Sequence, residues 1–275
     1  MGSTVERLLV RTWNLFHGNT QPPTRRAFLR EMVGLASADR PAVLCLQELP
    51  VWSLARLEAW SGMTPIADVT ERPRIGPFRS SAELGRLITE LDHGLFRSAF
   101  TGQANAILLA PDLRVLEHRH LVLNSFRFRR AEARHLGIGA AARRAWGKER
   151  RVCQVVRLGR GDAMFVVGNL HATGSSDKRL ADAELLRAAV FADGLARPAE
   201  PVVLCGDFNL SVRNSRTLAS LKGPDWGFTG PTPIGIDHVL VRGLHADPPE
   251  RWPTERRSFD GRVLSDHAPV DREVE

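Results

Sequence analysis

The sequence of 275 residues contains no tyrosine, only three cysteines and only three lysines. Cys45, Cys153 and Cys205 are too few and too scattered for a disulfide framework or a cysteine zinc site. Cys45 and Cys205 lie in apolar runs, which predicts buried thiols. The chain has no run of about 18 apolar residues and no hydrophobic segment behind a basic N-terminus. We therefore expect no stable membrane insertion, no secretory signal and a cytoplasmic location.

Because lysine is scarce, arginine carries most of the positive charge, and the formal net charge is +7. The charge is unevenly distributed. Between Arg114 and Arg160, twelve arginines and one lysine oppose three glutamates, so this segment carries +10 and the rest of the chain −3. A basic segment favours an anionic partner, which leaves nucleic acid, a phosphorylated substrate and a membrane surface as alternatives.

The apolar runs are short and rich in β-branched residues, and helical patterns separate only some of them. The expected strands are Leu8–Asn14, Val43–Gln47, Ala104–Leu109, His120–Leu123, Val152–Leu158, Met164–Leu170, Val202–Cys205 and Ile236–Val241, with a last strand after His267. The expected helices are Arg25–Ala36, Trp52–Trp60, Ala82–Leu91, Lys178–Leu195 and Arg216–Leu221. We predict an α/β fold of the α+β type, a four-layer sandwich of two mixed β-sheets packed face to face with helices outside. No linker or repeat divides residues 1–275, which predicts a single domain.

Six short motifs place polar residues where apolar runs end or begin. They are Thr12-Trp13-Asn14, Gln47-Glu48, Asn169-Leu170-His171, Gly206-Asp207-Phe208-Asn209, Ile236-Asp237-His238 and Ser265-Asp266-His267. Each alone is typical of a turn or cap, but together they predict a site. Carboxylate and amide oxygens suit a hard cation such as Mg²⁺ or Mn²⁺, and histidines around such a cation favour attack of water on a phosphate. We expect Gly206 to permit a close approach of the backbone.

In content and order, these motifs resemble the endonuclease/exonuclease/phosphatase superfamily, whose fold is that of deoxyribonuclease I. The matching residues run from Asn14 to His267. The resemblance implies that Glu48 is the main ligand of a Mg²⁺ or Mn²⁺ ion, with Asn14 beside it and Asp266 assisting. His17 is either a neighbour of this site or an ordinary surface or core histidine.

The resemblance also implies the catalytic roles. Asp207 would orient or deprotonate the attacking water, and Asn209, expected on the same face of one strand, would hold the phosphate or that water. His267 would contact the scissile phosphate as acid, base or electrostatic stabiliser. Asp237 would keep His267 charged, because a nearby carboxylate raises the pKa of a histidine. His171 would donate to a non-bridging phosphate oxygen as negative charge develops there.

Two departures bear on the substrate. Abasic-site enzymes of this superfamily commonly have an acidic residue where this chain has Phe16, and a tyrosine where it has His171. The chain therefore resembles the branches with a second histidine, which include deoxyribonucleases, phospholipid phosphodiesterases and sugar-phosphate phosphatases. Asn105 resembles the family's strand that enters the site, which implies a place in substrate binding.

The core of the basic segment, Asn124 to Arg151, falls between two expected strands. It interleaves Phe126, Phe128 and Trp146 with Arg129, Arg130, Arg143 and Arg144. Arginines and aromatics together favour a phosphate backbone and its bases, so we predict that these four arginines bind substrate. The same residues would also serve an anionic membrane surface, and the alternative to both is a solvated, partly mobile loop.

The prediction is a Mg²⁺- or Mn²⁺-dependent phosphodiesterase of the endonuclease type, which cleaves nucleic acid by in-line attack of water. The alternatives are a phosphatase or phospholipase C-like hydrolase of a small or lipid phosphate, and a catalytically silent binding protein on the same fold. The sequence implies no protein partner, and we expect a monomer.

Overall fold

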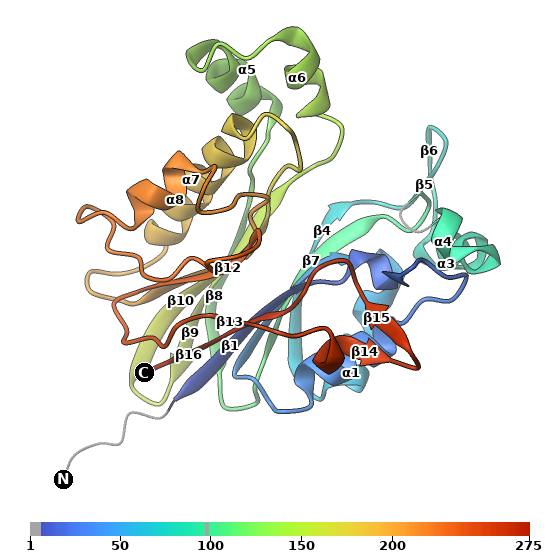
Figure 1. The fold of residues 1–275 in the computed structure, drawn as a ribbon, viewed down its shortest axis with the longest axis horizontal. Coiled ribbons are helices and arrows are strands. Elements are labelled where there is room, and N and C mark those ends of the chain that lie inside the picture. Colours follow the sequence, from blue (N-terminus) through green and yellow to red (C-terminus); the bar gives the residue numbers. More distant parts are fainter. Residues whose placement is uncertain (1–6, 97–98) are drawn as a thin grey trace.

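In a computed structural model, which describes residues 7–96 and 99–275, two large β-sheets face each other between layers of helices (Figure 1). The first sheet has the order β13 (Glu250–Arg251), β16 (Val270–Val274), β1 (Leu8–Asn14), β3 (Val43–Leu49), β7 (Gln103–Leu109) and β4 (Thr64–Glu71). The second has the order β12 (Asp237–Arg242), β11 (Val202–Asp207), β10 (Ala163–His171), β9 (Val152–Arg160) and β8 (Arg114–Val122). The β1–β3 and β10–β11 pairs are parallel and their other neighbours antiparallel, so both sheets are mixed as predicted.

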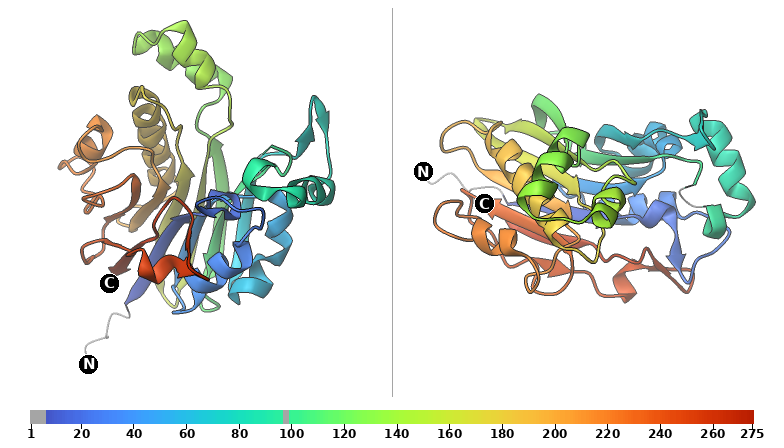
Figure 2. Two further views of the ribbon diagram at one scale, coloured as in Figure 1. Left: turned by 45° about the vertical axis from the view of Figure 1, so that its right-hand side comes forward. Right: turned by 90° about the horizontal axis from the view of Figure 1, so that it is seen from above.

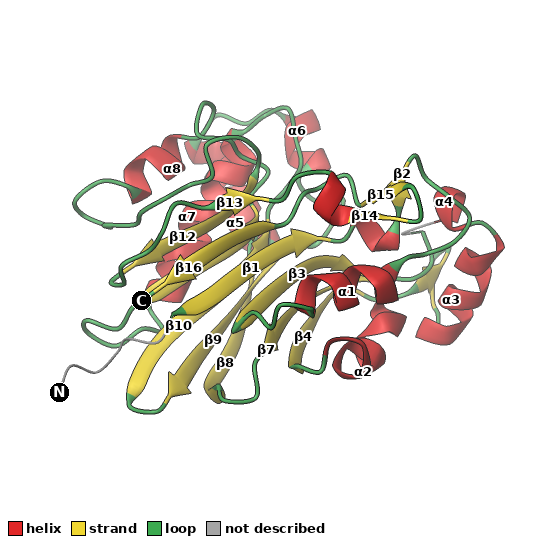
Figure 3. Cartoon of the chain, turned by 60° about the horizontal axis from the view of Figure 1, so that its bottom comes forward, coloured by secondary structure: helices red, strands yellow, loops and turns green. Residues whose placement is uncertain are grey.

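Successive residues of the central strands point to opposite faces, and both faces are buried. Val43 and Cys45 face the second sheet, whereas Leu44 packs in the layer that includes α1 (Leu29–Ser37) and α2 (Leu57–Ser61) (Figure 3). On β11, Cys205 faces the first sheet and Leu204 packs against α7 (Arg179–Asp193). The Sγ atoms of Cys45 and Cys205 lie 3.2 Å apart in the core. Burial on both faces explains why these strands read as continuous apolar runs.

Several boundaries differ from the prediction. The helix expected at Arg25–Ala36 begins only at Leu29, and the one expected at Trp52–Trp60 starts as a 3₁₀ helix, η2 (Val51–Arg56), before α2. Helix α3 (Ala82–Leu91) and α8 (Arg216–Leu221) are where they were predicted. Strand β11 ends at Asp207. Asn209 therefore lies beyond the strand, and the prediction that it shares a strand with Asp207 was wrong.

The sequence did not predict β4 or the first half of β8, because edge strands have no continuous apolar run. Asp68 of β4 joins these two edges across the sandwich. Its carboxylate lies 2.8 Å from Nε2 of His118 and 3.0 Å from Nδ1 of His120, both on β8.

The basic segment between β8 and β9 is helical, rather than a solvated loop. We call residues 124–151 the arm; it contains α5 (Phe126–His135) and α6 (Ala140–Ala145), which stand beyond the sheets (Figures 1 and 2). Trp146 is fully buried beneath them and packs with Ile138 of the arm and Leu180 of α7. At the base, the Asn124 amide donates to the carbonyl of Trp146 over 2.9 Å and accepts from the backbone N–H of Arg151 over 2.9 Å.

A second projection rises on the other side of the same strand ends (Figure 2). It contains β5 (Arg74–Ile75), β6 (Phe78–Arg79), α3 and α4 (His93–Phe96). The remaining elements are η1 (Phe16–Gly18), η3 (Glu255–Arg257) and a small sheet of β14 (Ser258–Phe259), β15 (Arg262–Leu264) and β2 (Thr20–Gln21). In the described part of the chain, no helix combines the length and the apolar character needed to cross a membrane.

Candidate active site

The predicted polar residues meet where β1, β3, β10 and β11 end and β12 begins. Strand register places several of them side by side, because His171 pairs with Asp207 and Asp207 pairs with Asp237. Asn14 ends β1 opposite Gln47 of β3, and its amide nitrogen spans to the second sheet. That nitrogen donates to Glu48 Oε1 over 3.1 Å and to Asp207 Oδ2 over 3.0 Å.

Three other motif residues, Thr12, Gln47 and Asn169, form a buried network between the sheets. The Gln47 side-chain nitrogen donates to Asn169 Oδ1 over 2.7 Å and to Thr12 Oγ1 over 3.0 Å. The Asn169 amide in turn donates to the carbonyls of Leu46 and Ala106. This network joins the two sheets directly below the site, so these residues act in support rather than in chemistry.

Unusual backbone conformations are concentrated here. Glu48, Asn209 and Ser265 have φ of 54°, 53° and 60°, in the left-handed region that side chains rarely adopt. Glu48 lies at an irregularity in the β3–β7 pairing, which turns its carboxylate out of the regular ladder. A Cβ on Gly206 would lie 1.9 Å from the carbonyl oxygen of Leu170, so the close approach expected of this glycine is confirmed.

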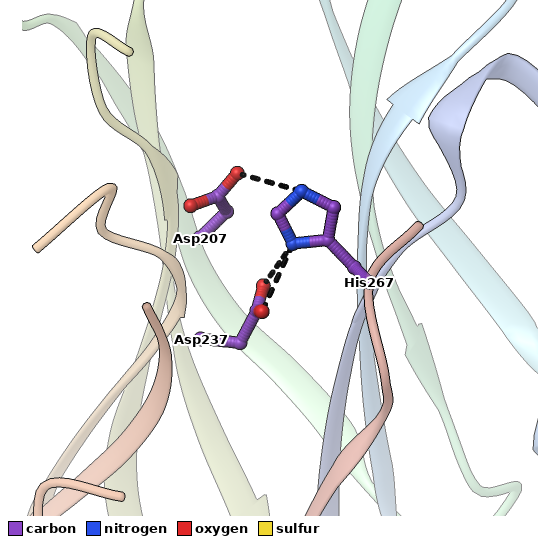
Figure 4. A group of neighbouring side chains, drawn as sticks. All are labelled: Asp207, Asp237 and His267. Atoms are coloured by element: carbon purple, nitrogen blue, oxygen red, sulfur yellow. Dashed lines mark hydrogen bonds and ion pairs between the residues drawn. The ribbon is translucent and has the colours of Figure 1, made fainter. Parts of the chain in front are cut away.

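His267 lies between the carboxylates of Asp237 and Asp207 (Figure 4). Its Nδ1 is 3.0 Å and 2.9 Å from the two Asp237 oxygens, and its Nε2 is 3.8 Å from Asp207 Oδ2. The Ser265 hydroxyl fixes this segment by donating to the carbonyl of Asn14 over 2.7 Å and accepting from the backbone N–H of His267 over 3.0 Å. The exposed Asp266 places Oδ1 3.9 Å from Nε2 of His267.

Burial and charge set different protonation states for the groups in this site. Burial lowers the pKa of His267, but the hydrogen bond and charge of Asp237, with the charges of Asp207 and Asp266, outweigh it and raise the pKa to about 10. Burial and the charge of Asp237 raise the pKa of Asp207 to about 7. Burial and the charge of Arg151 hold the pKa of His171 well below its usual range. At neutral pH, His267 is therefore charged and His171 neutral.

The oxygen-rich donor set fits a hard divalent cation. Asp207, Asp237 and His267 have ligand atoms within 4.8 Å of one another. His267 is nevertheless a poor ligand here, because its Nδ1 is bonded to Asp237 and a protonated imidazole offers no lone pair to a metal. The carboxylates of Asp207 and Asp237 already surround the imidazolium of His267. Of the acidic residues here, Glu48 is therefore better suited to hold a metal ion.

The surroundings of Glu48 add detail to the predicted metal residues. His17, with φ of 55°, places Nε2 3.4 Å from Glu48 Oε2, so it is a neighbour of this carboxylate. Asn14 presents its amide nitrogen to Glu48, while its oxygen accepts from the backbone N–H of Phe16 over 3.0 Å. For its oxygen to bind a metal beside Glu48, the Asn14 amide would have to turn over.

Arg151 reaches the site from the base of the arm, and the sequence did not single it out. Its Nη1 lies 2.9 Å from Nδ1 and 3.0 Å from Nε2 of His171. A hydrogen bond in the ring plane would leave one of these nitrogens much farther away, so the guanidinium lies over the face of the ring. Nη2 pairs with Glu149 at 2.6 Å, and the buried Nε has no hydrogen-bond partner among the described residues.

Asn209 and Asn105 differ in how they relate to the cluster. The backbone N–H of Asn209 donates to Asp207 Oδ1 over 2.9 Å, and its side chain donates to the carbonyl of Ala172. Asn105 is fully buried on β7 and donates to the carbonyl of Val152 over 3.4 Å, while its Oδ1 has no hydrogen-bond partner in residues 7–96 and 99–275. Its role in substrate binding stays a prediction.

The four arginines predicted to bind substrate lie on the arm, apart from the cluster of His171, Asp207, Asp237 and His267. Arg129, Arg130, Arg143 and Arg144 line one pocket of about 570 Å³ together with Phe126 and Gly147. The structure thus brings the four together and shows that the segment they belong to continues into the site through Arg151.

Comparison with known proteins gives matches over almost the whole chain. The family model described as the Endonuclease/Exonuclease/phosphatase family matches residues 12–267. The human Nocturnin catalytic domain with bound sulfate anion aligns with a TM-score of 0.65 at 13% identity, covering 98% of this chain and 93% of that one. Humanized D. rerio TDP2 aligns with a TM-score of 0.64 at 13% identity, over 98% and 99% of the two chains.

A functionally unknown conserved protein from Enterococcus faecalis V583 aligns with a TM-score of 0.63 at 17% identity, over 98% of this chain and 99% of that one. At such identities, the structural likeness shows a common fold. No curated protein sequence matches the chain.

Proposed function

The chain belongs to the endonuclease/exonuclease/phosphatase family, a family of phosphoester hydrolases, and from that premise we propose that it is a divalent-metal-dependent phosphodiesterase that cleaves nucleic acid. The observation that carries the proposal is the imidazolium of His267 held between two carboxylates, beside a neutral His171. A carboxylate of raised pKa can accept a proton from water, and a charged and a neutral donor can stabilise the phosphate as water attacks.

Asp207 would accept the proton of the attacking water. Its raised pKa of about 7 lets it stay ionised in part at neutral pH and still hold a proton well. The backbone N–H of Asn209 and the amide of Asn14 fix its two oxygens, so its orientation is set before the substrate binds. The Asn209 side chain, beside this carboxylate, would hold the phosphate or the water.

The two histidines would stabilise the phosphate as water attacks. His267 would donate from Nε2 to a phosphate oxygen, while Asp237 holds Nδ1 and keeps the ring charged. His171 would donate to a non-bridging oxygen, and Arg151 above it would add a positive charge. The P–O bond opposite the water then breaks, and the leaving oxygen takes up the Nε2 proton of His267, which yields a phosphomonoester and an alcohol.

Glu48 would hold Mg²⁺ or Mn²⁺, with Asn14 beside it and Asp266 assisting. When bound, such an ion polarises the phosphoryl group and lowers the pKa of a bound water. The carboxylate of Glu48 is only partly exposed and lies 3.7 Å from Nε2 of His171, which supports a metal at Glu48 next to the histidine that would contact the phosphate.

A substrate panel tests this function. Purified protein would be assayed on bis(p-nitrophenyl) phosphate, p-nitrophenyl phosphate, single-stranded DNA, plasmid, RNA and phospholipid vesicles, with Mg²⁺, Mn²⁺ or EDTA. We expect hydrolysis of the diester and of nucleic acid that EDTA abolishes. Asp207→Asn should lose this activity, whereas Asp225→Asn, which changes an exposed aspartate, should keep it.

Three results would contradict the proposal. Hydrolysis of the monoester alone would assign a phosphatase, and hydrolysis of phospholipid alone would assign a phospholipase C-like hydrolase. Full activity in EDTA would remove the metal from the proposed chemistry.

A further inference from the structure

The pocket on the arm gathers positive charge without neutralising it. Arg129, Arg130, Arg143 and Arg144 line it, with Phe126 and Gly147, and we call it the arginine pocket. Among residues 7–96 and 99–275, none of these four guanidinium groups pairs with a carboxylate, whereas Arg86, Arg157 and Arg179 elsewhere all do. Four like charges in one concavity repel one another unless an anion enters.

The pocket is built on a fixed frame. The rings of Trp146 and Phe128 pack edge to face with their centroids 5.8 Å apart. The guanidinium of Arg187 lies over the Phe128 ring, 4.2 Å from its centroid. The Trp146 ring nitrogen donates to the buried carboxylate of Glu184 over 2.5 Å. The frame therefore exists before a ligand arrives, which lowers the entropy cost of binding.

The position of Arg129 also depends on the backbone of the arm. Its Nε donates to the carbonyl of Asn124 over 2.8 Å, and its guanidinium rests against Gly147. A Cβ at residue 147 would lie 2.0 Å from Nη1 of Arg129. Glycine at this position thus lets a cation occupy the wall of the pocket.

We propose that the arginine pocket binds a phosphate and a base of single-stranded nucleic acid, at a distance from the phosphate that is cleaved. The proposal rests on the proposed function, because it extends the same substrate beyond the catalytic cluster. The volume of about 570 Å³ is within the range of pockets that hold small ligands and suits a nucleotide.

The choice of a single strand comes from Phe126. This ring is 70% exposed although it lines the pocket, so one of its faces is available for stacking. A duplex keeps its base faces inside its own stack, whereas a single strand presents them to aromatic side chains. Arg151, at the base of the arm, contacts His171, so the arm that carries the pocket ends in the candidate site.

Binding of a fluorescein-labelled twelve-nucleotide DNA, measured by anisotropy in EDTA so that the strand stays intact, tests the proposal. Arg143→Ala/Arg144→Ala should weaken binding about tenfold at low salt and flatten the slope of log affinity against log salt by about 1.4. The control, Arg30→Ala/Arg197→Ala, removes two exposed arginines far from the arm and should change neither quantity appreciably.

Two further variants separate geometry from charge. Gly147→Ala keeps all four arginines but displaces the guanidinium of Arg129, so it should weaken binding while the charge of the protein is unchanged. Phe126→Ala should lower the affinity for the single strand about fivefold or more, and Phe126→Trp should restore it. Circular dichroism of each variant checks that the fold is intact.

The results distinguish this proposal from the proposed function. Equal binding by the wild type and Arg143→Ala/Arg144→Ala, or a preference for the matching duplex that Phe126→Ala leaves unchanged, would overturn the arginine pocket as a single-strand site. So would binding to phosphatidylserine vesicles with none to the oligonucleotide. Metal-dependent hydrolysis of bis(p-nitrophenyl) phosphate by the wild type, measured separately, reports on the proposed function alone.

Discussion

The cluster proposed to be catalytic and the arginine pocket hold charge in opposite ways. In the cluster, Asp207 and His171 are almost fully buried and each charged group meets a partner fixed by the strands. In the pocket, Arg130, Arg143 and Arg144 are exposed and lack carboxylate partners in the described part of the chain. Buried charge is little affected by salt, whereas exposed charge is screened within a Debye length. We infer that the cluster sets the rate of the chemistry and the pocket sets the affinity for substrate.

The largest effect should come from removing the imidazolium. His267→Ala is expected to lower kcat on bis(p-nitrophenyl) phosphate by about 100-fold or more, because general acid–base catalysis typically contributes that much. KM should change far less. The exposed His245→Ala serves as control, and a kcat within twofold of wild type for His267→Ala would show that the cluster does not set the rate.

Loss of Glu48 should appear as a requirement for more metal. Mutation of a residue that only supports a metal ligand typically lowers metal affinity about tenfold or more, and mutation of the ligand itself should cost at least as much. We expect Glu48→Gln to need at least about tenfold more Mg²⁺ or Mn²⁺ for half-maximal activity. Metal titration of the hydrolysis rate measures this, with the exposed Glu58→Gln as control. An unchanged titration curve would place the metal elsewhere.

Arg151 tests the boundary between the two regions, since it leaves the arm but lies in the site. Arg151→Gln removes the guanidinium above His171 and should lower kcat/KM about tenfold or more, as expected for a lost charged interaction. Because Arg151 is buried, this loss should persist at high salt. The exposed neighbour Arg150→Gln is the matched control, and equal losses in both variants would make Arg151 an ordinary arm residue.

Glu184 joins the arm to the loop that follows His171. Its carboxylate accepts from the Trp146 ring nitrogen and from the backbone N–H and hydroxyl of Thr173. Glutamine offers one acceptor oxygen in place of two, so Glu184→Gln should lower the free energy of unfolding by about 1–3 kcal/mol. Denaturant unfolding measures the loss, and the exposed Glu255→Gln should show almost none.

The smallest effect concerns an ion pair remote from both regions. The hydrogen bonds from Arg157 hold the pKa of Glu200 at about 2, below its ordinary 4.5. Because the carboxyl of Glu200 has a lower pKa in the folded than in the unfolded protein, its ionised form stabilises the fold when the pH is above the unfolded pKa of 4.5. The stability difference between wild type and Glu200→Gln should therefore be constant near neutral pH. It should shrink as pH falls below 4.5 and vanish near 2. A difference that grows with acidity would contradict this assignment.

The buried strands were predictable because both of their faces are apolar, as at Val43–Leu46. The strand-end motifs were also predictable, because polar residues directly after a buried strand are expected at the edge of the sheet. The edge strand β4 and helices α5 and α6 were not predictable in this way. In the arm, arginines occupy most positions, so the few apolar residues that pack around Trp146 give no clear helical period.

Arg151 illustrates a different limit of the sequence. One arginine among twelve in the basic segment carries no local signal that distinguishes it from Arg150. Only the pairing of β8 with β9, and of β9 with β10, brings it to His171. His17 was a candidate by its spacing from Asn14, but its contact with Glu48 depends on the left-handed conformation of residues 16 and 17.

The way the arm is attached has a consequence for the evolution of the family fold. Val122 and Val152 are paired neighbours on antiparallel strands, so the arm begins and ends a single strand spacing apart. Insertions or replacements between them leave the register of β8 and β9 unchanged. Natural selection, or a laboratory graft, can therefore exchange the part of the arm before Arg151 as a module and give the same site a new preference among substrates.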